Sequence, residues 1–427
     1  MKRTRYSSLV VLALVVLLVP LAAFGQPKST IKQIYPDMYA AGGLIWKGMN
    51  MQETCWGKIC EDPSGRIWFS GGDHWGTDRK GDKFDDRYDR PWGFGNTTVC
   101  YYDPKTDKAY VGYEIDSASA LYSNFESPGH GKIHANIVSD SKGGIWTAGY
   151  MGSSYNHEFN SAYYPKGYAG GAVVRYNPDE NDIDYFGVPT PYGGQVAVYL
   201  DEQRDTVHGF SVDRGRYWRI NYKTKELKHY ETNGRFGIRE MITDHNGMCY
   251  FANEFNGLTM FNPDTETFTD LDITIPGLRA SVVSSDNIIW GISAEGFVWS
   301  YDTKSRKVEE YGHVVNVPDE RVYTPNVAID EERGRLYFIA GGHGVTLAGM
   351  PIITIFDIKS KKFYWPGKLD VDGCYGAVCS RDHNVYFGCY AYEQVDGKRT
   401  KDKDGKERRA NYLVKYVPPE NLEDLDI

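Results

Sequence analysis

The segment DPSGRIWFSG, residues 62–71, is the first copy of a pattern that decides the fold. It begins with a polar turn that contains aspartate and glycine, and it continues as a short apolar strand with an aromatic residue. Six further copies, some of them diverged, are DSKGGIWTAG (140–149), DEQRDTVHGF (201–210), DHNGMCYFAN (244–253), SSDNIIWGIS (284–293), EERGRLYFIA (331–340) and RDHNVYFGCY (381–390). A turn and strand that return in this way predict a repeat protein.

A second signal follows each copy, an apolar strand that ends in an aromatic residue and a polar turn. Its clear copies are VCYYDPKTDK, VVRYNPDEND, TMFNPDTETF, VWSYDTKSRK and TIFDIKSKKF, and its weaker copies are WRINYKTKEL and LVKYVPPENL. Together the two signals define seven units of four strands, and one such unit cannot bury both of its faces unless neighbours cover them. The sequence therefore predicts an all-β fold, a seven-bladed β-propeller. The last unit lacks its outer strand, and we expect the N-terminal segment STIKQIYP (29–36) to supply it and close the ring.

The N-terminus is typical of an exported protein. A basic start, MKRTR, precedes an apolar stretch with a small-residue exit, which predicts a secretory signal peptide over residues 1–25. The alternative interpretation is an uncleaved membrane anchor. Residues 26–427 are then expected to form a single propeller domain that is secreted or periplasmic, monomeric and free of the membrane once the signal is removed.

Composition limits the partners. The formal net charge of -9 argues against general nucleic-acid binding, but it leaves room for an anionic substrate in a locally basic pocket. The 33 tyrosines and 10 tryptophans suit short strands, and they also suit a surface that stacks on sugars. Because the chain has seven cysteines, at least one cannot form a disulfide within the chain. Two interpretations remain open, a Cys55–Cys374 disulfide and buried free thiols.

Long loops mark one face of the predicted ring as functional. The connections between second and third strands are long in blades 6, 7, 1 and 2 and short in blades 3 to 5, so consecutive insertions wall one side of that face. His134 begins the innermost strand of blade 2. There it either lines the central channel, held by hydrogen bonds, or takes part in the function of the protein. His157 follows in the loop of the same blade, and blade 3 offers Tyr192 with Arg214 and Arg216.

Two histidines, a tyrosine and an arginine suit β-elimination of a uronic-acid polysaccharide. A cation or hydrogen-bond donor neutralises the sugar carboxylate, a base removes the neighbouring proton, and an acid such as tyrosine protonates the leaving oxygen. Tyr199 or a tyrosine of the blade 2 loop can replace Tyr192 in this scheme, and Arg216 competes with Arg214.

The exported seven-bladed ring with His134, His157, Tyr192 and Arg214 in this chain order resembles the propeller-type ulvan lyases. Those enzymes cut between sulfated rhamnose and a uronic acid. The resemblance covers the layout of most of the chain and implies that these four residues are catalytic, with the histidines transferring protons or neutralising the carboxylate and the arginine binding it. It also implies an anionic polysaccharide as partner.

Other residues of the same face are candidates for binding substrate, namely His130, His74, Trp75, Arg216 and His343. No cofactor is expected. The blade 1 loop holds Asp78, Asp82, Asp85, Asp86 and Asp89, which could bind a structural Ca²⁺ through oxygen ligands, but it lacks EF-hand spacing and we interpret it as a solvated loop. The basic segment 397–409 is interpreted as a hairpin tip.

Three other functions remain open. The main alternative is a non-catalytic propeller that binds a glycan or protein through its loop-bearing face. A streptogramin-lyase-like enzyme shares the fold but is usually smaller, and it would need a histidine-bound metal. A quinone-dependent oxidoreductase would carry a tryptophan docking motif in its blades, and these blades do not repeat one.

Overall fold

The computed structural model of the protein describes residues 31–34, 36–40, 43–46, 55, 57–71, 97–115, 132–150, 170–191, 193–211, 215–232, 240–315, 322–341, 351–369, 371–392, 394–395, 398–399 and 409–425.

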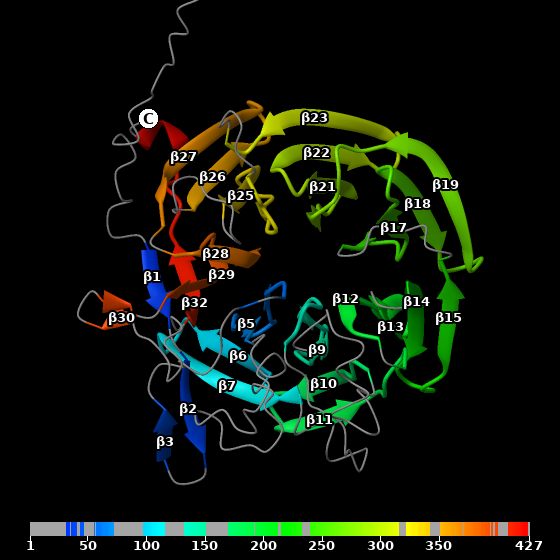
Figure 1. Ribbon diagram of the computed structural model, residues 1–427, viewed down its shortest axis with the longest axis horizontal. Helices are drawn as coiled ribbons and strands as arrows, with labels where there is room; N and C mark the ends of the chain where they lie inside the picture. The colour runs from blue at the N-terminus through cyan, green and yellow to red at the C-terminus, as the bar shows by residue number, and fades with distance from the viewer. Residues whose placement is uncertain are drawn as a thin grey trace, which may run out of the picture.

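Seven antiparallel sheets stand as blades around a central axis, which confirms the predicted seven-bladed β-propeller (Figure 1). Blades 2 to 6 each contain four strands that are consecutive in the sequence, and the first strand of each blade is the innermost. They are β8 (Val138–Ser139), β9 (Ile145–Ala148), β10 (Val173–Asn177) and β11 (Asp182–Tyr185) in blade 2; β12 (Gln195–Asp201), β13 (Thr206–Ser211), β14 (Arg216–Asn221) and β15 (Leu227–Glu231) in blade 3; β16 (Ile242–Thr243), β17 (Cys249–Ala252), β18 (Gly257–Asn262) and β19 (Thr267–Thr274) in blade 4; β20 (Ala280–Val283), β21 (Ile288–Ile292), β22 (Phe297–Asp302) and β23 (Lys307–His313) in blade 5; and β24 (Ala328–Asp330), β25 (Arg335–Ala340), β26 (Ile352–Asp357) and β27 (Lys362–Lys368) in blade 6.

The N-terminal strand closes the ring as expected. Blade 7 contains β28 (Gly373–Cys379), β29 (Val385–Tyr392) and β32 (Arg409–Tyr416), and β1 (Ile31–Ile34) pairs antiparallel with β32 as its outer strand. The register joins Ile31 to Tyr416 and Ile34 to Leu413. Between β29 and β32, the strands β30 (Gln394–Val395) and β31 (Lys398–Arg399) form a small antiparallel hairpin.

Blade 1 is wider than the repeat predicts. Its four regular strands are β4 (Cys60–Glu61), β5 (Ile67–Ser70), β6 (Thr98–Asp103) and β7 (Lys108–Glu114). Outside them, β2 (Pro36–Ala40) pairs in parallel with β7, and β3 (Gly43–Trp46) pairs with β2. The sequence pattern did not reveal this extension, because its partner strand lies some 70 residues further along the chain.

The Asp-x-x-Gly turns fold through a shared set of hydrogen bonds. Asp140 accepts the backbone N–H groups of Lys142 at 3.0 Å and Gly144 at 2.7 Å with one oxygen, and the indole of Trp146 at 3.0 Å with the other. Gly143 has a φ of 85°, a conformation that glycine adopts without strain. The aspartate, glycine and aromatic residue of the repeat are therefore one structural unit.

Hydrophobic clusters run around the ring between neighbouring blades. One cluster joins blades 1, 2 and 3 around Trp68, Trp146 and Trp218, and another joins blades 4 and 5 around Trp299. Each blade therefore buries its faces against its neighbours, as the repeat implied. The seven cysteines are all free thiols. Among the described residues, no helix is long and apolar enough to cross a membrane.

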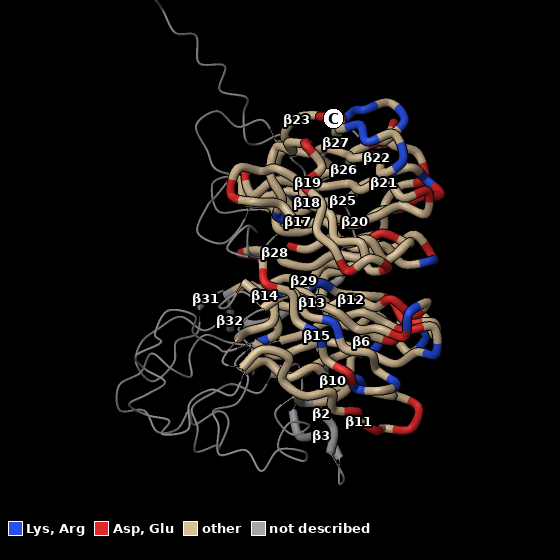
Figure 2. Tube along the Cα trace, turned by 90° about the vertical axis from the view of Figure 1, so that its right-hand side faces the viewer, with Lys and Arg blue, Asp and Glu red and all other residues tan. Residues whose placement is uncertain are grey.

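The ring has two different faces. The tight turns between first and second strands, and between third and fourth strands, lie on one face, here called the turn face, and their charged residues gather on the right-hand side of Figure 2. The innermost strands begin on the opposite face, here called the loop face, where the second strands end. This arrangement positions His134 and its neighbours at the loop face.

Candidate functional site

His134 lies at the loop-face end of blade 2 against the ring of Tyr150. The two ring centroids are 4.8 Å apart and the planes are perpendicular. Lys132 pairs with Tyr150 through two backbone hydrogen bonds of 3.2 and 2.8 Å, and its ammonium lies 5.3 Å from the centroid of the tyrosine ring. The three residues Lys132, His134 and Tyr150, here called the blade 2 cluster, bring together a cation, an imidazole and a phenol.

The local sequence explains how blade 2 presents this cluster. Ile133, Ala135 and Ile137 are buried in the core shared by blades 1 to 3. Because neighbouring residues of an extended chain point to opposite sides, Lys132 and His134 project away from that core. The ring of Tyr150 packs directly on the backbone of Gly194, where a Cβ would come within 2.4 Å of the ring.

Below the blade 2 cluster, polar side chains from several blades meet across the axis of the ring. The ammonium of Lys58 in blade 1 donates to the carboxylate of Glu240 before blade 4, to the hydroxyl of Tyr199 at 3.3 Å and to the carbonyl of Ser281 at 3.2 Å. The hydroxyl of Ser281 donates to the same carboxylate at 2.7 Å. The side chain of Asn136 in blade 2 also forms a hydrogen bond with Tyr199. We call these five residues the axial network.

Burial and charge fix the protonation states of the axial network. Burial alone would lower the pKa of Lys58, but the adjacent Glu240 carboxylate outweighs it and the pKa is raised. Burial, followed by the charge of Glu240, raises the pKa of Tyr199 to about 12. At neutral pH Lys58 is therefore charged and Tyr199 protonated, so that Tyr199 can donate a hydrogen bond but is a poor base.

A second group of side chains lies on the loop face in blades 5 to 7. The Nε of Arg279 donates to the hydroxyl of Tyr323 at 2.6 Å. Tyr323 packs with Tyr375 and Tyr390, whose rings stack at 5.9 Å. Arg279 lies two residues before Ser281, directly ahead of β20, and His134 lies two residues before Asn136, ahead of β8. Both side chains therefore sit on the loop-face side of the axial network, in blades that are separated by two others around the ring (Figure 1).

Most of the residues predicted for the site lie outside the described part of the chain. These residues are His157, Tyr192, Arg214, His130, His74, Trp75 and His343, together with the aspartates proposed for Ca²⁺. Arg216 is described and forms an ion pair of 2.9 Å with Glu231 of the outermost strand of blade 3. Its role as a substrate ligand stays a prediction. Among the described residues, no group of three or more histidine, cysteine, aspartate or glutamate side chains is arranged to hold a metal ion.

Several residues of the site were not identified from the sequence. Lys58, Asn136 and Glu240 each lie four residues before a turn aspartate, namely Asp62, Asp140 and Asp244. An alignment of the blades on that aspartate would have placed all three at one level of the axis. Tyr150 belongs to the blade 2 loop from which an alternative tyrosine was expected, but Lys132 and Arg279 carried no signal of their own.

Comparison with known proteins shows the fold alone. No family model and no curated protein matches the sequence. Among solved structures, an inactive histidine-to-alanine variant of virginiamycin B lyase from Staphylococcus aureus with quinupristin is similar over 91% of this chain and 99% of its own, with a TM-score of 0.56 and 11% identity. The WD40 repeats of RRP9 are similar over 92% of this chain and all of their own, with a TM-score of 0.55 and 9% identity. A fungal alcohol oxidase in complex with copper is similar over 92% of this chain and 76% of its own, with a TM-score of 0.54 and 10% identity. The same ring thus serves a lyase, a repeat domain and an oxidase, and function has to be inferred from the site.

Proposed function

We propose that the protein is an exported polysaccharide lyase that cleaves a uronic-acid-containing, ulvan-like polysaccharide by β-elimination at the loop face. The observation that carries this proposal is the blade 2 cluster, in which His134 meets the edge of Tyr150 with Lys132 above the same ring. Histidine is the side chain whose ordinary pKa suits proton removal near neutral pH, and tyrosine is a suitable acid for a leaving oxygen.

In this proposal, each group has one role in the reaction. Arg279, which is partly exposed, binds the uronate carboxylate and makes the proton on the neighbouring carbon more acidic. His134 removes that proton, its electron pair forms the carbon–carbon double bond, and the glycosidic carbon–oxygen bond breaks. Tyr150 protonates the departing oxygen. His157 and Arg214 remain candidates for a second proton carrier and a second carboxylate ligand.

Two further observations bear on the proposal. The axial network joins side chains of blades 1 to 5 across the ring below the cluster, so we expect a chain-like substrate to lie across the loop face. The virginiamycin B lyase with a similar ring is inactive when one of its histidines is replaced by alanine, so a propeller lyase can depend on a histidine. At 11% identity this parallel concerns the type of catalyst and no particular residue.

The proposal is tested by steady-state kinetics on ulvan and other uronate polysaccharides with three variants. We expect His134→Ala and Tyr150→Phe each to lower kcat/KM by roughly a hundredfold or more, the usual worth of a positioned acid or base. Tyr150→Phe keeps the ring that packs on Gly194. His313→Ala, on the exposed outer strand of blade 5, is the matched control and should keep full activity.

A loss of activity in a variant counts as catalytic only if the thermal unfolding of that variant is unchanged. Full activity in His134→Ala would place the chemistry elsewhere in the molecule and contradict the proposal.

The alternative function is a propeller that binds a glycan or protein without turnover. It requires only partly exposed polar side chains at the loop face, such as Arg279 and His134, and no base; the Tyr323, Tyr375 and Tyr390 group is buried beside Arg279 and supports that residue. Saturable binding of the polysaccharide with no product formed by the wild-type protein would favour this function over the lyase.

A further inference from the structure

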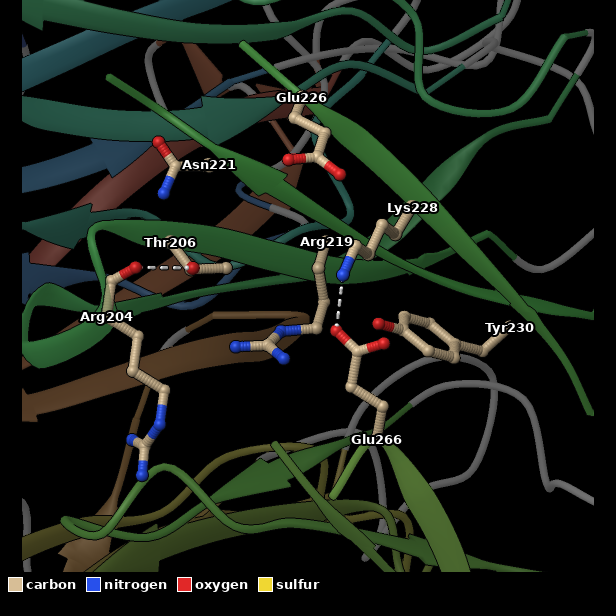
Figure 3. Close-up of a pocket in the computed structure, with 8 residues that line it drawn as sticks. All are labelled: Arg204, Thr206, Arg219, Asn221, Glu226, Lys228, Tyr230 and Glu266. Atoms are coloured by element: carbon tan, nitrogen blue, oxygen red, sulfur yellow. Dashed lines mark hydrogen bonds and ion pairs between the residues drawn. The ribbon is translucent and has the colours of Figure 1, made fainter. Parts of the chain in front are cut away.

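A cleft of about 170 Å³ opens between blades 3 and 4, away from the loop face. Its walls come from β13, β14 and β15 of blade 3, from the short helix η2 (Glu202–Arg204) and from the turn before β19 (Figure 3). Polar and charged side chains dominate the lining, which consists of Arg204, Thr206, Arg219, Asn221, Glu226, Lys228, Tyr230 and Glu266. The cleft can hold several water molecules or one small solute.

Arg219 lies in the middle of this set and is nine-tenths buried, with a relative exposure of 9% (Figure 3). One of its terminal nitrogens donates to the carbonyl of Pro263 at 3.2 Å, and the guanidinium lies 5.8 Å from the centroid of the Phe261 ring. Its Nε has no hydrogen-bond partner among the residues that the structure describes. A buried charge with so few acceptors is costly unless another group completes its coordination.

The carboxylates around Arg219 are already engaged by other cations. Asp264 accepts from Arg204 at 2.8 Å, and Glu266 accepts from Lys228 at 2.7 Å. Arg204 is also paired with Asp201 at 2.9 Å. Glu226 lines the cleft without an ion pair among the described residues. Within the described part of the chain, Arg219 therefore has carboxylates in its neighbourhood and no salt bridge of its own.

A second buried arginine, Arg335, differs from Arg219 in its terminal nitrogens, although the Nε of both lacks a hydrogen-bond partner among the described residues. Arg335 is 6% exposed, and its two terminal nitrogens donate to the carbonyls of Pro419 and Glu420 at 2.7 and 2.5 Å. Two carbonyls of the C-terminal segment thus face the guanidinium. At Arg219 only one carbonyl is supplied, and the cleft occupies the remaining side.

We propose that this cleft binds a small oxyanion, the sulfate, phosphate or carboxylate group of a solute, with Arg219 as its principal ligand. A planar guanidinium matches two oxygens of such a group at once. Lys228 at the rim adds a second positive charge, while Glu226 and Glu266 limit the site to a small anion and disfavour an extended polyanion. The site lies in a different part of the ring from the blade 2 cluster and does not depend on the proposed function.

The test is calorimetric titration of the purified protein with sodium sulfate, sodium phosphate and sodium glucuronate, each compared with sodium chloride at equal ionic strength. We expect saturable binding of at least one of the three oxyanions and none of chloride. Binding of the inorganic ions indicates a free-anion site, whereas binding of glucuronate alone indicates a carboxylate-bearing sugar. Equal, non-saturable heats for all four salts would overturn the proposal.

Variants separate the site from general effects on stability. Arg219→Gln should weaken binding by about tenfold to a hundredfold, the usual worth of hydrogen bonds from a charged group. Arg335→Gln removes a comparable buried arginine and should leave the affinity unchanged. If Arg219→Gln does not fold, Lys228→Gln, whose side chain is 48% exposed, takes its place and should weaken binding severalfold. Full affinity in the folded Arg219→Gln protein, or in Lys228→Gln where that variant takes its place, would contradict the assignment.

Discussion

At the scale of the residue, His208 is a buried histidine in a position that other blades fill with tryptophan or tyrosine. Its Nδ1 faces the hydroxyl of Tyr217 at 3.3 Å and the thiol of Cys249 at 3.6 Å, while its Nε2 has no hydrogen-bond partner in the described ranges of the chain. Burial, followed by the nearby charge of Arg219, lowers the pKa of His208 to about 3. The folded protein therefore keeps this imidazole neutral.

The lowered pKa predicts a pH-dependent stability. The unfolded chain binds a proton at His208 below its ordinary pKa of 6.5, while the folded chain does so only near 3. The stability linked to His208 is therefore fully present above pH 6.5 and is lost as the pH falls, by up to about 1.4 kcal/mol per pH unit. We expect His208→Phe to flatten this dependence. Urea unfolding of both proteins between pH 7 and pH 4 measures it, and parallel profiles would contradict the assignment.

At the residue scale, the sequence singled out His134, whose role in catalysis stays a prediction. His134 was identified from its place before an innermost strand, and the structure brings it against Tyr150 and Lys132. The Lys58–Glu240 pair was not identified, because the two residues lie 182 positions apart and only closure of the ring brings them together.

At the scale of the element, the turn between first and second strands was the most predictable feature. Its aspartate, glycine and aromatic residue lie close together in the sequence, and the hydrogen bonds that join them are local. The aspartate of this turn also accepts a hydrogen bond from a residue outside the repeated sequence pattern. In blade 2 the Nε of Arg175, from the third strand, donates to Asp140 at 2.7 Å.

We predict that Asp140→Ala destabilises the protein by on the order of 3 kcal/mol, because it leaves two backbone N–H groups, an indole and a guanidinium without their acceptor. Burial raises the pKa of Asp140, but hydrogen bonds from Arg175, Trp146 and Gly144 outweigh it and the pKa is lowered. Its contribution is therefore present above the ordinary pKa of 3.8 and is lost on further acidification.

Chemical denaturation at neutral pH measures the effect of this substitution. Asp179→Ala, at a side chain that is 78% exposed, is the control and should change the stability little. Equal stability of the two variants would show that the turn does not depend on its aspartate.

At the scale of the whole molecule, seven blades and their closure by an N-terminal strand were readable from the repeat. A missing outer strand in the last unit and an unassigned apolar segment near the N-terminus are complementary, and β1 pairs with β32 accordingly. The positions of the site residues across the ring were less predictable, since they depend on how the inner strands of different blades face one another.

Removal of the closing strand should weaken the entire ring. We predict that a protein beginning at residue 36 has a lower Tm and a stronger tendency to aggregate than one beginning at residue 31, because it exposes the edge of β32. Scanning calorimetry and light scattering compare the two. Identical behaviour would show that the strand is dispensable for closure.

The central claim is that this propeller performs an elimination, and the chemistry of the products tests it most directly. The wild-type protein, incubated with ulvan, should release oligosaccharides whose new non-reducing ends carry a conjugated unsaturated uronate, visible by ultraviolet absorbance and lighter by one water than a hydrolysis product. His134→Ala should release them at a rate lower by roughly a hundredfold or more. Products without the double bond, or intact polymer bound to an inert protein, would contradict a lyase at the blade 2 cluster.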